Sequence, residues 1–116
     1  MIIYSKKALR IQYEDNEIIK ILDDYISHND VGMFSYIQFC KFLFNYADEH
    51  NKLGKEKNIS YLSVEMMPED YRRVSRIIWE KIWNREIIID FYKDLYNQNY
   101  VDDTRFIIIR KKQDGK

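Results

Sequence analysis

The sequence predicts a small α+β domain that is predominantly helical. Glycine and proline, which form most tight turns, number only 3 and 1, so an all-β fold would lack the turn residues it needs. A broad apolar pattern with helical spacing fills Met33–Asn51, while strand-like patterns lie near both ends of the chain. We therefore expect a central buried helix and a short sheet formed by the N- and C-terminal strands.

Length and charge restrict the class of protein. A chain of 116 residues is enough for one core, so residues 1–116 are expected to form a single domain. Lysine plus arginine equals aspartate plus glutamate at 19 each, and electrostatic recognition must therefore be local. The richness in Ile, Lys, Asn and Tyr is typical of AT-rich coding sequences, as in many phages, plasmids and low-GC bacteria.

The expected location is the cytoplasm. The single cysteine, Cys40, excludes an intramolecular disulfide and fits a reducing compartment. The first residues lack the apolar region of a secretory signal, and no apolar run approaches the ~20 residues that span a bilayer. We expect no membrane partner.

Two elements are predicted before the central helix. Residues Ala8–Tyr13 alternate apolar and polar side chains, which indicates a strand. Asn16–Ser27 has apolar residues on one helical face and Asn16 as a capping residue, which favours a helix. A hairpin running from Leu9 to Leu22 is the alternative.

Met33–Asn51 gives the clearest helical pattern. Its apolar positions cover an arc of roughly 220°, too wide for a surface helix. We expect this helix at the centre of the core, with Gly54 as a plausible stop. The apolar arc consists of Tyr36, Ile37, Phe39, Cys40, Phe42, Leu43, Phe44, Tyr46 and Ala47.

A second strong helix is predicted from Pro68 to Trp83. Proline suits the first turn of a helix, and acidic Glu69 and Asp70 follow where the positive end of the helix dipole favours them. The preceding segment, Ile59–Met67, fits a short strand or a short helix, and both remain open. The expected inward stripe of the second helix consists of Tyr71, Val74, Ile78 and Ile82.

The last third of the chain contains one open question and one predicted strand. Ile87, Phe91 and Leu95 continue at helical spacing, so either the preceding helix extends through residues 86–97 or another begins near Glu86. Phe106–Ile109 is a short apolar run with charged residues on both sides, as expected of a buried strand.

The candidate site is a stripe on the helix that starts at Pro68. Arg72, Arg76, Trp79 and Trp83 are spaced by four, three and four residues, which places them on one helical face beside the inward stripe. Tryptophan and arginine are enriched at binding hot spots and stack well on aromatic groups. The structural alternative is that the indoles are partly buried against the core.

Residues 27–39 resemble the second half of an EF-hand. Gly32 stands at the sixth loop position, Phe34 at the eighth, and Phe39 would start the exit helix. The residues at the first, third, fifth and twelfth loop positions are Ser27, Asn29, Val31 and Gln38. Because none of these four residues is a carboxylate, we expect no calcium binding. The resemblance then implies a helix–loop–helix arrangement without metal.

Other chemical motifs are weak. Tyr100-Val101-Asp102-Asp103 resembles the Tyr-x-Asp-Asp tetrapeptide of reverse-transcriptase-like polymerases, but the resemblance covers four residues, and an acidic turn is the better interpretation. Cys40 falls in the apolar arc, where a thiol is inert. His28 and His50 lack ligand partners at suitable spacing. We therefore expect no catalytic residue, no cofactor and no bound metal.

A winged-helix DNA-binding regulator is the alternative function. In that reading Ile59–Met67 and Pro68–Trp83 form a helix-turn-helix, and Ile87–Leu95 with Phe106–Lys112 form a wing. The neutral charge and the helical spacing of residues 87–95 argue against it. The residues expected to contact DNA are Arg72, Arg73, Arg76, Arg110, Lys111 and Lys112.

The leading hypothesis is a non-enzymatic protein–protein interaction module. It would be an inhibitor, immunity protein or adaptor of a bacterium or mobile element, acting by occluding a surface of another protein. Trp79 and Trp83 would be its aromatic anchors, with Arg72 and Arg76 as charged neighbours.

Overall fold

The computed structural model describes residues 2–4, 7–55, 59–61, 63–90 and 104–110, and it confirms the predominantly helical α+β class. Its helices are α1 (Asp15–Ser27), α2 (Tyr36–Glu49) and α3 (Pro68–Trp83). Its strands are β1 (Ile2–Tyr4), β2 (Lys7–Leu9), β3 (Met33–Ser35), β4 (Ile59–Tyr61), β5 (Val64–Met66), β6 (Ile87–Ile89) and β7 (Arg105–Ile108).

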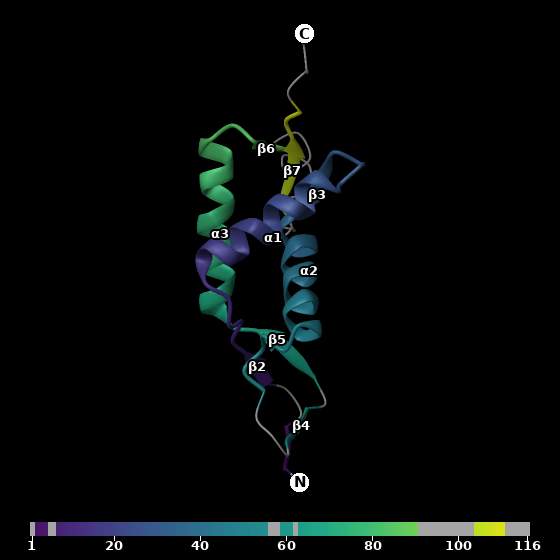
Figure 1. The fold of residues 1–116 in the computed structure, drawn as a ribbon, viewed down its shortest axis with the longest axis vertical. Coiled ribbons are helices and arrows are strands. Elements are labelled where there is room, and N and C mark those ends of the chain that lie inside the picture. Colours follow the sequence, from purple (N-terminus) through teal and green to yellow (C-terminus); the bar gives the residue numbers. More distant parts are fainter. Residues whose placement is uncertain (1, 5–6, 56–58, 62, 91–103, 111–116) are drawn as a thin grey trace.

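Within the described residues, the strands form three small sheets at the two ends of the molecule (Figure 1). β1 pairs in parallel with β4 and β2 in parallel with β5, while β3, β7 and β6 form an antiparallel sheet with β7 in the middle. The predicted sheet of N- and C-terminal strands is therefore wrong in its pairing. The N-terminal strands lie at one end of the long axis and β7 at the other, because each pairs with strands from the interior of the sequence (Figure 1).

The N-terminal segment follows its predicted pattern. Leu9, Ile11 and Tyr13 are buried while the residues between them are exposed, although only Lys7–Leu9 belong to a strand and Ile11 forms a single bridge with Leu53. Helix α1 replaces the alternative hairpin and buries the residues Ile18, Ile21 and Leu22.

The cap of α1 differs from the prediction. Glu14, not Asn16, is the N-cap residue, and the Glu17 carboxylate accepts a hydrogen bond of 3.1 Å from the Glu14 N–H. This places Asn16 inside the first helical turn. A Glu three residues after the cap is the arrangement that satisfies the free N–H groups at a helix start.

The central helix begins later than predicted. Met33–Ser35 pair with β7, and α2 starts only at Tyr36. Ser35 Oγ accepts the Gln38 N–H at 3.1 Å, and Gln38 Oε1 accepts the Ser35 N–H at 2.8 Å, which is a capping box. The helix ends at Glu49, and the left-handed residue after it is Asn51 (φ 58°), so Gly54 is not the stop.

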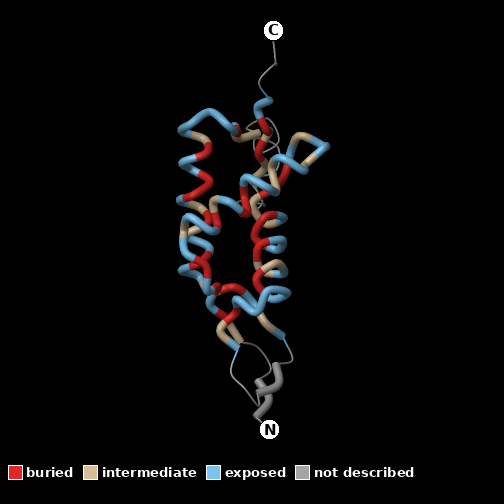
Figure 2. The backbone as a smooth tube through the Cα atoms, viewed as in Figure 1, coloured by how far each residue is buried: buried red, intermediate tan, exposed pale blue. Residues whose placement is uncertain are grey.

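One stripe of α2 lies at the centre of the core. Its buried residues are Phe39, Cys40, Leu43 and Ala47. The rest of the apolar arc is partly exposed, and Phe42, for example, retains 38% of its accessible surface while its ring lies 4.8 Å from that of Tyr25. Figure 2 shows buried positions on the sides of α2 and α3 that face each other.

A glycine turn joins α1 to β3. Gly32 has φ +85°, a conformation that glycine adopts without steric cost. Its N–H donates to the Asn29 side chain at 3.0 Å, and the Asn29 amide donates to the Met33 carbonyl at 3.1 Å. The chain order α1, loop, β3, α2 agrees with the helix–loop–helix arrangement that the EF-hand resemblance implies.

Helix α3 starts at Pro68 as predicted, and the open segment before it forms β4 and β5. The helix ends at Trp83, because Arg85 has φ 60° and the Glu86 N–H donates back to the Lys81 carbonyl. The helix therefore does not continue into Ile87–Ile89, which is β6. Phe91, Leu95 and the tetrapeptide 100–103 lie outside the described residues.

The predicted C-terminal strand is present as β7, one residue earlier than expected. Phe106 and Ile108 are buried in the core. Across the described ranges, none of the helices has both the length and the apolar character needed to cross a membrane.

Truncation of Leu43 tests the central position of α2. Leu43 has no exposed surface, so Leu43→Ala should lower the free energy of unfolding by about 2–5 kcal/mol through lost contacts and a cavity. Phe42→Ala, on the partly exposed side of the same helix, is the matched control and should cost less. Urea unfolding of both variants checks this, and a cost below about 1 kcal/mol for Leu43→Ala would contradict it.

Candidate functional site

The Arg/Trp stripe lies on the outward face of α3. Trp79 and Trp83 retain 59% and 87% of their accessible surface, and the Arg76 side chain retains 58%. The stripe was predicted to lie beside the inward face, but it lies opposite that face. The structural alternative was that both indoles are partly buried against the core. It is wrong for Trp83, which is almost fully exposed, and it holds only in part for Trp79, of whose accessible surface less than half is buried.

The correction follows from which residues of α3 are buried. The inward face consists of Asp70, Val74, Ile77, Ile78 and Lys81. Tyr71 and Ile82, which were expected to point inward, are exposed by 36% and half-buried respectively. The inward face is thus rotated around the helix axis, away from the tryptophans.

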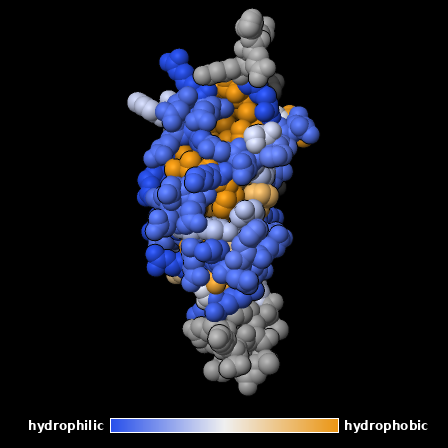
Figure 3. Space-filling model, viewed as in Figure 1, coloured by the Kyte–Doolittle hydropathy of each residue, from blue (hydrophilic) through white to orange (hydrophobic). Residues whose placement is uncertain are grey.

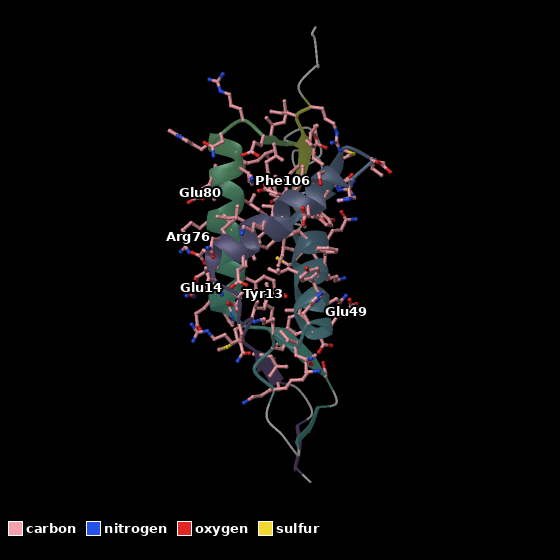
Figure 4. The ribbon with its side chains drawn as sticks, viewed as in Figure 1. Tyr13, Glu14, Glu49, Arg76, Glu80 and Phe106 are labelled. Carbon is pink, nitrogen blue, oxygen red and sulfur yellow. The ribbon has the colours of Figure 1, made fainter. Side chains whose placement is uncertain are left out.

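The two arginines of the stripe differ in their surroundings. Arg76 Nη2 lies 2.5 Å from Asp15 Oδ2, in an ion pair whose members are both about half exposed. Such a pair contributes little and is easily exchanged for another partner. Arg76 and Glu80 extend from the outer side of α3 (Figure 4). Arg72 is exposed, and the described residues make no hydrogen bond or ion pair with its side chain.

A buried carboxylate fixes the start of α3. Asp70 is only 1% exposed, its Oδ2 accepts the Ile11 N–H at 2.8 Å, and its Oδ1 accepts Arg73 Nη1 at 2.9 Å. Arg73 also donates to Asp15 Oδ1 at 2.9 Å and to the Tyr13 carbonyl. These bonds tie α3 to the segment between β2 and α1.

Arg73 was a DNA-contacting candidate in the alternative function, and the structure gives it a different position. All three of its guanidinium nitrogens donate hydrogen bonds within the protein, and its side chain is only 19% exposed. The sequence signal was the Asp70/Arg73 spacing of three, which places the two side chains on neighbouring positions of a helix.

The structure also departs from the other features expected of a winged-helix DNA-binding protein. Ile59–Tyr61 and Val64–Met66 are strands, so the expected helix-turn-helix does not form, although β6 and β7 do pair as a wing would. Arg110 donates to the Asn29 carbonyl, and Lys111 and Lys112 lie outside the described residues.

A buried lysine fixes the other end of α3. Lys81 is 8% exposed, pairs with Asp23 of α1, and lies 3.1 Å from the Glu86 carboxylate. Burial acts to lower the pKa of Lys81, but the hydrogen bonds and charges of the two carboxylates outweigh it and raise that pKa. Ion pairs therefore hold α3 to the rest of the fold near both of its ends.

A solvent-open cleft of about 300 Å³ adjoins the stripe. Trp79 forms part of one wall, together with other residues of α3, and Tyr36 and Ile89 contribute from α2 and β6. The remaining lining residues are Ser75, Ile78, Ile82, Thr104 and Phe106. The cleft has no signature in the sequence, because its walls come from four separate elements: α2, α3, β6 and β7. In Figure 3 the apolar surface gathers in the upper half of the molecule, framed by polar surface.

The remaining chemical candidates have structural roles. Burial raises the pKa of the Cys40 thiol to about 12, which makes it a poor nucleophile at neutral pH. His28 and His50 lie at the ends of α1 and α2, each with Nδ1 2.8 Å from a backbone carbonyl of its own helix. In the described part of the chain, no three His, Cys, Asp or Glu side chains lie close enough together to hold a metal ion.

No protein-family model, curated protein or solved structure matches this chain. The function is therefore inferred from the geometry of α3 and its surroundings.

Removal of Arg73 tests its role in fixing α3. Arg73→Ala should lower the free energy of unfolding by about 3–5 kcal/mol, because it leaves the Asp70 carboxylate buried without its charged partner. Arg72→Ala, one residue away on the exposed face, should change it by less than about 0.5 kcal/mol. Chemical denaturation measures both, and equal effects would contradict the assignment.

The pH dependence of stability should report Asp15. The hydrogen bonds from Arg73 and Arg76 lower the pKa of Asp15, and its charged form therefore stabilises the fold above the ordinary aspartate pKa. That stability is lost as the pH falls through the lowered pKa of the folded state. Asp15→Asn should weaken the loss between about pH 5 and about pH 2, and Asp30→Asn, in an exposed loop, should not. Denaturation midpoints across that range decide.

Proposed function

We propose that this protein is a non-enzymatic binding module that occludes a surface of another protein through the outward face of α3. Its class would be an inhibitor, immunity protein or adaptor, working in the reducing cytoplasm that its single buried thiol suits. The observation that carries the proposal is the exposure of Trp79 and Trp83, by 59% and 87%, on one face of a fixed helix.

Two exposed indoles side by side call for an explanation. A fully exposed tryptophan offers on the order of 200 Å² of mostly apolar surface, and Trp79 and Trp83 retain 59% and 87% of their accessible surface for burial against a partner. Tryptophan, tyrosine and arginine dominate the energetics of protein interfaces, and Tyr71 lies next to the stripe with 36% exposure. The stripe therefore has the composition of a small hot-spot cluster.

Rigidity supports the same reading. The Asp70–Arg73 and Lys81–Asp23 pairs hold both ends of α3, so little conformational freedom of the backbone is lost when a partner binds. Arg72 and Arg76 supply cations that can reach a partner's carboxylates. The surface of the partner is expected to be apolar at its centre and acidic at its rim.

Truncation of the indoles separates binding from folding. Trp79→Ala and Trp83→Ala should each weaken binding of the partner by about 2–4 kcal/mol while changing the free energy of unfolding by less than about 1 kcal/mol. Val31→Ala is the matched control, because Val31 is 80% exposed on a loop away from α3. A partner captured from the native host and purified is titrated calorimetrically against each variant.

The same titration addresses the DNA-binding alternative. If the captured partner is a nucleic acid, binding should weaken steeply with salt because phosphate contacts release counterions. Capture of a nucleic acid that binds with such salt dependence, or unchanged affinity of a folded Trp79→Ala, Trp83→Ala double variant, would overturn the proposed function.

A further inference from the structure

The Arg/Trp stripe lies opposite the buried face of α3. At about 100° per residue, its four residues fall within an arc of about 60°, and the centre of the buried face lies about 180° away. All four side chains are exposed, and α3 forms one long side of the molecule (Figure 1). A helix of another molecule can therefore lie along the stripe, which consists of Arg72, Arg76, Trp79 and Trp83.

The spacing of the stripe is that of a coiled-coil seam. Steps of four, three and four residues repeat the alternation that places the contact residues of a heptad on the line between two packed helices. From Arg72 to Trp83 the seam is about 16 Å long, since an α-helix rises 1.5 Å per residue. Both cations lie in its N-terminal half and both indoles in its C-terminal half. The two halves therefore differ in chemistry.

Two antiparallel copies of this seam complement each other. Around a two-fold axis midway between Arg76 and Trp79, Arg76 of one copy faces Trp79 of the other. The same axis places Arg72 opposite Trp83 of the other copy, because both pairs have the same midpoint in the sequence. Each guanidinium then meets an indole, which attracts it through a cation–π interaction. A parallel arrangement would instead bring identical arginines together.

The charges beside the seam fit the same arrangement. Glu80 is exposed, and its carboxylate forms no hydrogen bond or ion pair with a described residue. It follows Trp79 directly and therefore comes to lie beside Arg76 of the other copy, where opposite charges attract. Arg76 can keep its ion pair with Asp15, because that contact uses the edge of the guanidinium and leaves its flat face for the indole.

The size of the contact indicates a weak dimer. A fully exposed tryptophan has on the order of 200 Å², so exposures of 59% and 87% leave roughly 300 Å² of indole surface in each copy. With the arginines added, the two copies bury a total near ~1,000 Å², the lower limit for specific interfaces. We expect a dissociation constant on the order of tens of micromolar, as in transient complexes.

We propose that two copies of this chain pair reversibly through antiparallel α3 helices, with each arginine of the stripe against a tryptophan of the other copy, and that this pairing conceals the binding face. The second part rests on the proposed function, since it needs a partner for the concealed face. Self-association then regulates binding: the dilute chain presents the stripe, and the concentrated free chain holds it inside the dimer.

Sedimentation equilibrium of the full chain measures the pairing. Between about 1 and about 500 µM it should show monomer and dimer without larger species, because a two-fold contact closes on itself. Arg72→Ala or Trp83→Ala should each raise the dissociation constant about tenfold or more, since each change removes its contact twice. Val31→Ala, exposed by 80% on a loop away from α3, is the control and should leave it unchanged. A chain that stays monomeric throughout, or that forms open-ended assemblies, would contradict the pairing.

A mixture of two double variants tests the register. Arg72→Ala, Arg76→Ala keeps only the indoles, and Trp79→Ala, Trp83→Ala keeps only the arginines. Each loses every cation–π contact with its own kind, whereas the mixed dimer retains half of them. In NMR titrations the mixture should associate at least about fivefold more tightly than either variant with itself. If the indole-only variant associates with itself as tightly as the parent chain, or if mixing adds no affinity, the register is wrong.

Charge reversal beside the seam tests the regulatory part. Glu80→Arg places like charges next to each other in the dimer and should weaken pairing about fivefold or more. Glu49→Arg, at the exposed end of α2 on the opposite side of the molecule, is the matched control (Figure 4). The apparent affinity of the parent chain for the captured partner should fall as its concentration rises above the dimer dissociation constant, and that of Glu80→Arg should fall less. An affinity independent of concentration would remove the regulatory role.

The proposed function fails separately. If the chain stays monomeric while the captured partner loses affinity for Trp79→Ala, the dimer falls and the proposed function stands. If the chain dimerises as described while the captured partner is insensitive to both tryptophans, the proposed function and the regulatory role fall, and the dimer stands.

Discussion

The orientation of α3 depends on one buried carboxylate. Asp70 is almost fully enclosed, and hydrogen bonds from the Ile11 N–H and the Arg73 guanidinium offset the loss of its hydration. Both partners must therefore be in place whenever α3 packs. This requirement sets the rotation of the helix about its own axis, and with it the residues that face solvent.

Local patterns predicted most of the helical structure. Pro68 marks the start of α3, the apolar stripe through Leu43 identifies α2, and the apolar run at Phe106 identifies β7. These signals depend on neighbouring residues alone. The end of α3 carries no such signal, because an arginine, Arg85, occupies the left-handed position where glycine is the usual marker.

The pairing of the strands could not be predicted from the sequence. Short parallel pairs such as β2 with β5 join residues more than fifty positions apart, and nothing in either segment specifies the other. Met33–Ser35 were assigned to a helix for the same reason, since their strand conformation depends on pairing with β7. The predicted fold class is nevertheless correct, because it depends mainly on the helices.

The candidate site was found in the sequence, but its orientation was not. The spacing of Arg72, Arg76, Trp79 and Trp83 already placed them on one face. The direction of that face depends on Asp70 and Lys81, two charged residues that sequence patterns place at the surface but that are buried in the structure. The carboxylates of Asp23 and Glu86 stabilise Lys81 in its buried position. The cleft beside Trp79 is visible only in the assembled fold, because α2, α3, β6 and β7 all contribute residues to its walls.

The buried cysteine provides an intrinsic probe of how often the core of the protein opens. Cys40 is 3% exposed, and the elevated pKa of its thiol further suppresses the thiolate that alkylating reagents attack. A reagent can modify it only during excursions that separate α2 from the rest of the core. The alkylation rate under native conditions therefore measures how often the core opens, without any label or engineered probe.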